Sequence, residues 1–371
     1  MFYALYVWFY DPEGFFSFLR LFNYLTSRAI FAVITSFFFV LIAGRPMIRA
    51  LYERGLRDTA RLELSPSGGD PKKTGTPTMG GLILLLATLV SCLLWCDLSN
   101  RFIQILLVAS VWFAGLGYLD DSRKIRHQDS SKGLSRGKKY AGQTLFGLML
   151  SGVFLHPVLS PVPPEIAPKL YVPFCKFPVL DLSWGYSVVI VLAVIYAANA
   201  INFADGMDGL AIMPSAYVIA VYGAFAYVLG NAKYSRYLMF DYFPGAGEVM
   251  IFCAILVGAC VGFLWFNSYP AEVFMGDTGS MFLGGTVGTM IVLLKQEILF
   301  LIVGGIFLAE ILSVALQDWL GIQRIGRRFL YRAPIHDCFQ YMGLSETKIT
   351  IRFWIVSGIL ALVGLASLKI R

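Results

Sequence analysis

The sequence has very few charged residues. Asp, Glu, Lys and Arg make up only 14% of its 371 residues, whereas about 25% is usual in soluble domains. This scarcity excludes a soluble globular protein. The 30 Phe, 19 Tyr and 7 Trp exclude a disordered chain as well, because so much apolar surface cannot stay hydrated. With 57% hydrophobic residues and a mean hydropathy of +0.69, the composition predicts a polytopic membrane protein.

Cysteine and histidine are also scarce, and neither forms a metal-binding pattern. There are six cysteines and three histidines, and no pair of cysteines has a second pair of Cys or His to complete a tetrahedron. The cysteines are Cys92, Cys96, Cys175, Cys253, Cys260 and Cys338. Five of them lie in or against apolar segments, so we interpret them as small packing residues, and a zinc site is disfavoured.

Long apolar runs are abundant. A bilayer-spanning helix needs about 20 residues. Runs of about this length fall at residues 27–44, 79–96, 102–119, 140–157, 184–202, 210–229, 248–266, 279–295, 298–320 and 351–368. We therefore predict an all-α polytopic membrane protein with about ten transmembrane helices, built as one integral membrane domain over residues 1–371.

The net charge of +7 reports orientation rather than a nucleic-acid partner, because the cations lie in loops between apolar runs instead of forming one patch. Positively charged loops stay on the cytoplasmic side of a membrane. With the N-terminus outside, the inner segments hold 19 Lys and Arg and the outer segments hold 9. Both termini are therefore predicted on the outer, periplasmic side, and no nucleic-acid partner is expected.

Five polar clusters interrupt the apolar pattern, and all five fall on the predicted cytoplasmic side. They are Asp120-Asp121, then Asn199, Asn202, Asp205 and Asp208 at intervals of three, the segment from Asn267 to Ser280 that contains Asp277, the basic segments around Lys72-Lys73 and 132–139, and His336. Adjacent carboxylates at a membrane boundary need a nearby cation to remain ionised. An amide-rich acidic strip without local cations suits a polar ligand.

Four of the five clusters also have a simpler interpretation. Asp120-Asp121 could be a solvated cap beside Arg123 and Lys124, Asp277 a helix cap, the basic segments membrane anchors, and His336 a structural residue. Their shared location favours chemistry instead. Carboxylates, amides, lysines and a histidine without thiolates indicate Mg²⁺-assisted phosphate chemistry on the cytoplasmic face.

Five segments resemble the polyprenyl-phosphate N-acetylhexosamine-1-phosphate transferases and, within them, the phospho-N-acetylmuramoyl-pentapeptide transferases. The segments are GTPTMGG, LDDSRK, NFADGMDGLA, GFLWFNSYPAEVFMGDTGS and IRFWIVSGILALVGLASLKIR. The resemblance implies a multi-pass enzyme of the bacterial inner (plasma) membrane, acting as a homodimer with Mg²⁺. Its implied substrates are UDP-N-acetylmuramoyl-pentapeptide and undecaprenyl phosphate, its products lipid I and UMP, and its pathway peptidoglycan synthesis.

The resemblance also implies roles for individual residues. Asp277 would be the principal metal ligand, and Asp120 and Asp121 would manage the metal or the lipid phosphate; with His336 these are the expected catalytic residues. The expected substrate-binding residues are Lys73, Thr78, Lys139, Asn199, Asn202, Asp205, Asp208, Asn267, Phe274 and Gln317. Among them, Phe274 would stack on uracil, and Lys139 and Asn267 would lie near the diphosphate.

One departure from the family pattern stands in the last inner loop. The family typically carries three consecutive histidines there, whereas this chain reads His336-Asp337-Cys338. A sibling enzyme that transfers another N-acetylhexosamine phosphate therefore stays open as an alternative. From other classes, a secondary transporter and a cell-wall scaffold also stay open, although Glu310 is the only clear interior charge that a transporter would use. Direct displacement and a covalent aspartyl intermediate are not distinguished.

Overall fold

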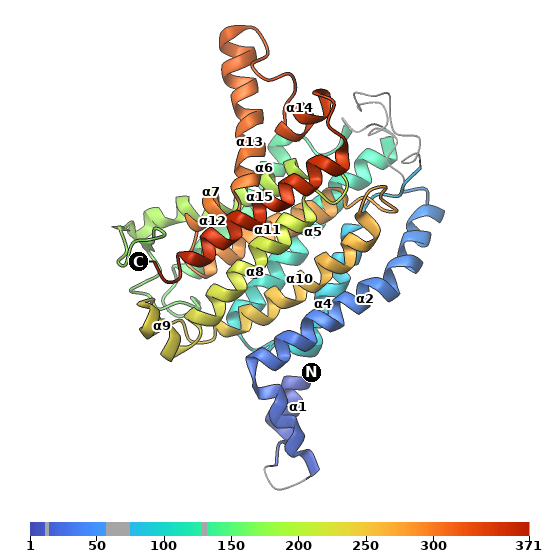
Figure 1. Ribbon diagram of the computed structural model, residues 1–371. Coiled ribbons are helices and arrows are strands. Elements are labelled where there is room, and N and C mark those ends of the chain that lie inside the picture. The colour runs from blue at the N-terminus through green and yellow to red at the C-terminus, as the bar shows by residue number, and fades with distance from the viewer. Residues whose placement is uncertain (12–14, 57–74, 128, 130–131, 371) are drawn as a thin grey trace.

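The computed structural model describes residues 1–11, 15–56, 75–127, 129 and 132–370. Long helices form a bundle, and a two-stranded antiparallel hairpin pairs Lys169 with Asp181 (Figure 1). The longer helices are α2 (Leu25–Glu53), α4 (Gly81–Trp95), α5 (Arg101–His127), α6 (Arg136–Phe154), α7 (Tyr186–Ala204), α8 (Ile212–Leu229), α10 (Gly247–Asn267), α11 (Gly276–Leu293), α13 (Gly305–Leu316) and α15 (Glu346–Ala366). The shorter elements are α1 (Phe2–Phe9), α9 (Ala232–Leu238), α12 (Leu299–Val303), α14 (Ile335–Tyr341), β1 (Lys169–Leu170), β2 (Leu180–Asp181), the 3₁₀ helices Phe15–Asn23 and Ser183–Gly185, and the π-helix Gln317–Ile325.

The expected all-α membrane architecture is confirmed. Within the described ranges, seven helical segments are long and apolar enough to cross a membrane. They are Leu25–Glu53, Arg101–His127, Ser183–Ala204, Ile212–Leu229, Gly247–Asn267, Gly305–Arg324 and Glu346–Ala366. The apolar helix α4 is shorter, with 15 residues, and α6 and α11 lie on two further predicted runs. A multi-pass protein follows, while ten crossings and the side of the termini stay predictions.

Two helices differ from the predicted runs in ways that affect the site. Helix α5 continues six residues past Asp121 to His127, so the two aspartates lie within a helix rather than at its end. The run predicted at 298–320 is divided at Gly304 into α12 and α13, and α13 continues into the π-helix. As a result α13 leans away from the bundle (Figure 1).

Helix α11 lies at the centre of the bundle. Every residue from Thr278 to Leu293 is buried, and the helix packs mainly against α5 and α7. Small residues permit this close approach, since a Cβ at Gly284 would lie 2.7 Å from the Cα of Ala198 on α7. The first turn of α11, which carries Asp277, is thereby held between the C-terminal part of α5 and the last turn of α7.

Candidate active site

Asp121 caps the N-terminus of α11 from a different helix. Its Oδ1 accepts a hydrogen bond from the Asp277 backbone N–H at 3.1 Å, and its Oδ2 accepts from the Thr278 N–H at 2.8 Å and the Thr278 hydroxyl at 2.7 Å. Free N–H groups and the positive end of the helix dipole favour a carboxylate at this point. Asp121 therefore fixes α5 against the start of α11.

Asp120 and Asp277 face two lysines. The Lys124 ammonium lies 2.7 Å from Asp120 Oδ2 and 3.1 Å from Asp277 Oδ2. The Lys139 ammonium lies 2.9 Å and 2.6 Å from the same two oxygens. Asp120 Oδ1 also accepts a hydrogen bond from the Leu134 N–H. Two cations thus bridge two carboxylates that come from α5 and α11.

Asp277 and Lys139 precede the apolar parts of their helices, and each stabilises the charge on the other. Burial raises the pKa of the Asp277 carboxyl, but the hydrogen bond with Asp120 and the attraction of Lys124 and Lys139 outweigh it and hold this pKa well below its usual range. Burial lowers the pKa of the Lys139 ammonium, but the attraction of Asp277 outweighs it and the net shift is upward. Both groups are therefore charged at neutral pH.

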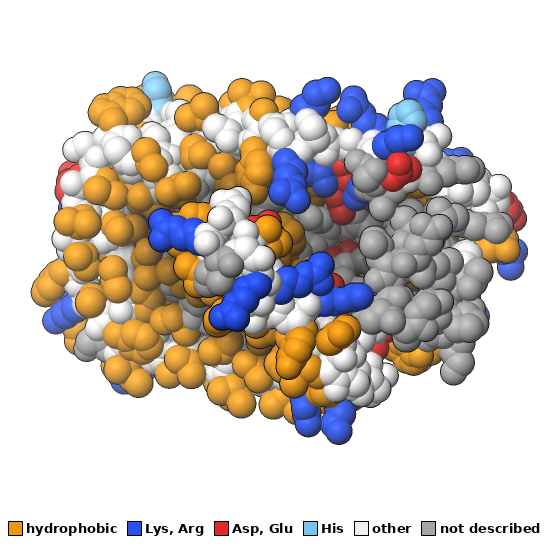
Figure 2. All heavy atoms as spheres, turned by 90° about the horizontal axis from the view of Figure 1, so that it is seen from above, with side chains coloured by type: hydrophobic (Ala, Val, Ile, Leu, Met, Phe, Trp, Pro, Cys, Tyr) orange, Lys and Arg blue, Asp and Glu red, His pale blue; other side chains and the backbone are white. Residues whose placement is uncertain are grey.

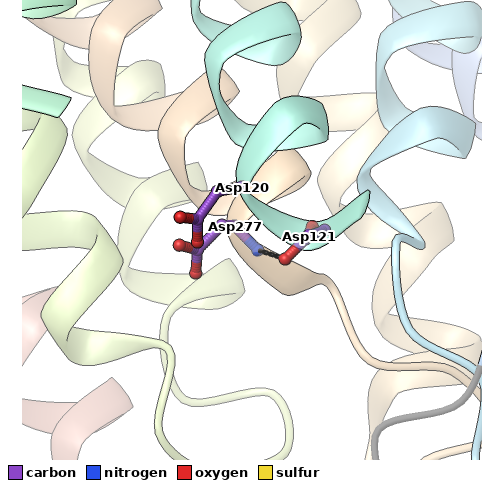
Figure 3. A group of neighbouring side chains, drawn as sticks. All are labelled: Asp120, Asp121 and Asp277. Atoms are coloured by element: carbon purple, nitrogen blue, oxygen red, sulfur yellow. Dashed lines mark hydrogen bonds between the residues drawn. The ribbon is translucent and has the colours of Figure 1, made fainter. Parts of the chain in front are cut away.

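The three aspartates fit a divalent cation. Each offers one carboxylate oxygen, and the three oxygens lie within 4.8 Å of one another. Figure 3 shows Asp120 and Asp277 side by side, with Asp121 turned toward the backbone of α11. Oxygen-only donors are typical of Mg²⁺ and unsuited to zinc. The two lysines contact two of these carboxylates, Asp120 and Asp277, so positive charge lies beside them whether or not a metal is present.

The expected strip of four polar residues is divided among different partners. Helix α7 ends at Ala204, so only Asn199 and Asn202 are helical. Asn202 Nδ2 donates to Asp277 Oδ1 at 3.1 Å and to Ser280 Oγ at 2.8 Å, which places it in the aspartate cluster. Asn199 Nδ2 instead donates to Gln143 Oε1 at 2.7 Å. Asp205 is the C-terminal cap residue of α7 and is partly buried.

Asp208 and Asn267 join the loops around the cluster. Asp208 Oδ2 accepts a hydrogen bond from the Ala271 N–H at 3.1 Å. Asn267 Oδ1 accepts from the Gly209 N–H at 3.1 Å, and its Nδ2 donates to the Val273 carbonyl at 2.9 Å. Both side chains are buried, at 2% and 4% exposure. Their contacts hold the loop after α7 against the loop before α11.

Thr78 and Phe274 lie in neighbouring segments that share backbone hydrogen bonds. The Phe274 N–H donates to the Pro77 carbonyl, and the Phe274 carbonyl accepts from the Gly80 N–H, both at 2.9 Å. The Phe274 ring, expected to stack on uracil, is only 3% exposed. Thr78 is 6% exposed. Lys73, expected to bind the nucleotide, lies outside the described residues.

His336 is oriented by Glu310, a buried carboxylate on α13. Its Nδ1 lies 2.9 Å from Glu310 Oε2, and both side chains are almost fully buried. The Nε2 atom faces the loop after α7, because a Cβ at Gly206 would lie 2.0 Å from it. Asp337 Oδ1 is 3.5 Å from the same Nε2. The histidine therefore lies between α13 and the NFADGMDG segment.

Gln317 begins the π-helix after α13 and contacts the next loop. Its Oε1 accepts hydrogen bonds from the N–H groups of Phe329 and Leu330, at 3.1 and 2.9 Å. Its Nε2 donates to the Leu330 carbonyl at 3.3 Å. Gln317 thus fastens the segment that leads to His336, and its side chain is 5% exposed.

Sequence reasoning missed three residues of this site. It considered Lys124 only as a partner in a solvated cap, although Lys124 follows Asp120 by one helical turn. Gln143, fully buried, follows Lys139 by the same spacing and contacts Asn199. Glu310 stood out as an interior charge, but its partner is 26 residues away in sequence, so no local pattern connects it to His336.

The site opens at one end of the bundle. Figure 2 shows this end, where Lys and Arg side chains lie beside a depression in which carboxylates are visible. A multi-pass helical bundle with a carboxylate and lysine cluster at one end defines an integral membrane protein equipped to handle phosphate groups.

The comparison with known families agrees with this class. The model of the family described as glycosyl transferase family 4 matches residues 103–295, which include all three aspartates and Lys139. The chain belongs to this family, and thus to the polyprenyl-phosphate hexosamine-1-phosphate transferase superfamily. It is therefore a phosphoglycosyl transferase, with a lipid and a nucleotide sugar as its substrates.

Proposed function

We propose that this enzyme transfers phospho-N-acetylmuramoyl-pentapeptide from its UDP derivative to undecaprenyl phosphate, at the cytoplasmic face of the bacterial plasma membrane. The products are lipid I and UMP. The observation that carries the proposal is the cluster of Asp120, Asp121 and Asp277 with two bridging lysines. The donor specificity rests on the long resemblance through GFLWFNSYPAEVF, and the enzyme is expected to work as a homodimer, as that resemblance implies.

The reaction exchanges one phosphoanhydride bond for another. An oxygen of the lipid phosphate attacks the β-phosphorus of the donor, the bond from that phosphorus to the bridging oxygen breaks, and UMP leaves with the electron pair. Negative charge accumulates on the oxygens around the transferred phosphorus. Lys124 and Lys139 supply compensating positive charge, because each is placed between carboxylates that a phosphate can replace as partner.

Mg²⁺ would be held by Asp277, Asp120 and Asp121, and when bound it would neutralise the diphosphate. Asp121 has a second task, since its hydrogen bonds to the start of α11 set the position of Asp277. Asn202 holds the Asp277 carboxylate from the other side. The chain therefore presents Asp277 in a fixed orientation before any substrate binds.

The remaining predicted residues surround this centre. His336 is proposed as a hydrogen-bond donor or acid-base group for phosphate or nucleoside, with Glu310 setting its orientation. Asp205 and Thr78 are proposed to contact the nucleotide sugar, together with Lys73. Asn199, Asp208, Asn267, Phe274 and Gln317 are proposed to shape the donor site. The contacts of the last four fix the loops that enclose it, and the hydrogen bond between Asn199 and Gln143 joins α7 to α6.

A second candidate is a sibling activity with another UDP-N-acetylhexosamine. It is favoured by His336-Asp337-Cys338, which replaces the three histidines typical of the muramoyl enzymes. These three residues lie in the first turn of α14, which brings His336 to the NFADGMDG segment, so a change of donor would alter contacts there.

One assay separates the candidates. Purified full-length protein is incubated with Mg²⁺, undecaprenyl phosphate and an equimolar mixture of UDP-N-acetylmuramoyl-pentapeptide, UDP-N-acetylglucosamine and UDP-N-acetylgalactosamine. Mass spectrometry of the lipid product should show the muramoyl-pentapeptide adduct, with equimolar release of UMP. A lipid carrying another sugar would establish the sibling activity. Absence of UMP with every donor would contradict both.

A further inference from the structure

A second polar site lies beside the aspartate cluster, at the inner end of α2. An open cavity of about 560 Å³ separates this helix from the loop that precedes α4. It is lined by Arg45, Ile48, Arg49 and Tyr52 on α2, and by residues 75–77 and Glu272 on the other side. Nothing in the proposed reaction uses these α2 side chains.

Arg45 and Arg49 offer hydrogen-bond donors to the cavity. In the part of the chain that the structure describes, neither guanidinium forms a hydrogen bond or an ion pair, and both side chains are exposed at the cavity. A guanidinium presents five N–H groups in a planar fork that matches phosphate oxygens. Arg45 and Arg49 are one helical turn apart, so both guanidinium groups are presented to this cavity. The cavity is therefore suited to an anion with several oxygens.

The surface of α2 below the arginines is apolar and uncovered. Four large side chains follow one another at intervals of one turn and are between 46% and 74% exposed: Ile30, Ile34, Phe38 and Ile42. Arg45, Arg49 and Tyr52 continue the same face of the helix, because steps of three and four residues keep to one side. One face of α2 thus presents a stripe of apolar side chains first and guanidinium groups after them. A lipid needs this arrangement, because its acyl chain is apolar and its headgroup is charged.

The height of the arginines fits a lipid headgroup. Twenty residues separate Leu25, where α2 begins, from Arg45. At 1.5 Å per residue this is about 30 Å, the thickness of the hydrocarbon core of a bilayer. With the start of α2 at one boundary, the cavity lies level with the phosphates at the other. A soluble nucleotide has no use for the apolar stripe below.

The charge of the cavity favours a single negative charge. Among the described residues that line it, two arginines and Glu272 give a net charge of +1. A phosphodiester carries one negative charge, whereas a phosphomonoester carries about 1.5 to 2 at neutral pH. The Glu272 carboxylate would repel the second charge. The cavity is thus better matched to an ordinary glycerophospholipid than to a polyprenyl phosphate.

From these observations we infer that the cavity binds the phosphodiester headgroup of a membrane glycerophospholipid, whose acyl chain lies along the exposed stripe of α2. The bound lipid supports the active site through one loop. Thr78 N–H donates to the carbonyl of Leu56 just beyond α2, and Phe274 N–H donates to the Pro77 carbonyl, both at 2.9 Å. On its other side this loop reaches Asp121, since a Cβ at Gly276 would lie 2.8 Å from Asp121 Oδ2 and 3.0 Å from Thr78 Oγ1.

Native mass spectrometry of the full chain in detergent, titrated with phosphatidylglycerol, tests this inference. The double variant Arg45→Gln/Arg49→Gln should bind its first lipid at least tenfold more weakly than the wild type. The matched control is Lys348→Gln/Arg352→Gln, which removes two exposed cations one turn apart on α15, away from the cavity. It should bind like the wild type. Equal lipid binding by the wild type and the α2 variant, with both folded by circular dichroism, would overturn the inference.

Competition identifies which lipid phosphate is bound. Undecaprenyl phosphate is added at the concentration at which the first phosphatidylglycerol molecule binds. It should not displace that phosphatidylglycerol. If undecaprenyl phosphate displaces phosphatidylglycerol from the wild type but not from the α2 variant, the cavity binds the acceptor substrate. That result would contradict a phospholipid site. Because these measurements need no nucleotide sugar, their outcome is independent of whether the proposed reaction is correct.

Discussion

At the scale of single residues, the three aspartates differ in how their charges are already satisfied. Asp121 accepts three hydrogen bonds from the first turn of α11. Asp120 and Asp277 are paired with lysines, which a metal or a phosphate can displace. We therefore expect substitutions of Asp121 to change stability as well as activity, and substitutions of Asp277 to change mainly activity.

Asp277→Asn should abolish turnover without unfolding the protein. The amide still contacts Asn202, and Lys124 and Lys139 keep Asp120 as a partner. The neutral amide of the variant cannot replace the carboxylate charge that holds a metal against the diphosphate. Loss of such a charge costs about 3 kcal/mol or more, roughly a hundredfold in rate. Steady-state UMP release measures the effect, and a thermal unfolding curve checks the fold. Asp129→Asn is the control, because it neutralises another partly buried carboxylate, one that pairs with Lys132. Activity of Asp277→Asn within tenfold of the wild type would contradict the assignment.

His336→Ala should lower kcat/KM by about a hundredfold, within the range for a lost acid-base group or charge-assisted contact. Glu310→Gln should have a smaller effect of about tenfold, because an amide oxygen can still accept a hydrogen bond from Nδ1. Asp337→Ala should change kcat/KM less than threefold, as this side chain is more exposed than its neighbour. The three variants are compared in one assay with both substrates varied. An indispensable Asp337 beside a dispensable His336 would mean that the start of α14 functions through a carboxylate instead of the histidine.

The sequence indicated the members of the aspartate cluster but not their contacts. Asp120 and Asp121 were recognised because adjacent carboxylates at a membrane boundary are costly without a cation. Asp277 was noted at the predicted start of a helix, and its role as a metal ligand came from the family resemblance. That Asp121 caps α11, and that Asn199 turns to Gln143 while Asn202 reaches Asp277, depends on how α5, α7 and α11 pack. Those contacts join residues 56 to 157 positions apart, and no local pattern carries such information.

At the scale of helices, apolar length predicted where helices lie better than where they end. The charges after Asp121 suggested a boundary, yet α5 continues to His127, since a helix needs only hydrogen bonds to pass from lipid into water. The division at Gly304 was missed because the flanking residues are uniformly apolar. Helix ends here are set by tertiary contacts and by single glycines, which hydropathy does not register.

The contact between α5 and α11 should be sensitive to a single methyl group. A Cβ at Gly117 would lie 2.2 Å from the Asp277 carbonyl oxygen, so Gly117→Ala must push α5 away from the start of α11. Overpacking of this kind costs about 1 to 3 kcal/mol. Because Asp120 and Asp121 follow within one turn, we expect activity to fall at least tenfold, measured as UMP release.

Gly115→Ala is the matched control on the same helix. Apart from its chain neighbours and the backbone of its own helix, no described residue has an atom within 4 Å of a Cβ at Gly115, which faces outward. Alanine is a better helix former than glycine by about 1 kcal/mol, so this variant should be as stable as the wild type or slightly more so. Equal activity of Gly117→Ala and Gly115→Ala would show that the spacing of α5 and α11 does not limit the reaction.

At the scale of the whole molecule, helices α6 and α7 run from the active-site end of the bundle to its opposite end. Lys139 lies near the start of α6, and Asn202 lies near the end of α7. Each helix has 19 residues, or about 28 Å at 1.5 Å per residue. The connection between them, which contains the β1 and β2 hairpin and Cys175, therefore lies at the other end of the bundle. If Lys and Arg report orientation correctly, this connection faces the periplasm.

A natural cysteine allows that orientation to be tested. Cys175 is exposed and the other five cysteines are buried, so a membrane-impermeant maleimide should label the unmodified protein in intact cells, and Cys175→Ser should abolish the labelling. In the Cys175→Ser background, Ser345→Cys supplies a site at the other end: Ser345 is exposed and precedes Glu346, whose Oε1 accepts a hydrogen bond from the Asp208 N–H beside the active site. This cysteine should react only after the inner membrane is opened. The opposite result, with Ser345→Cys labelled in sealed cells and Cys175 protected until permeabilisation, would place the aspartate cluster outside, where no cytoplasmic nucleotide sugar could reach it.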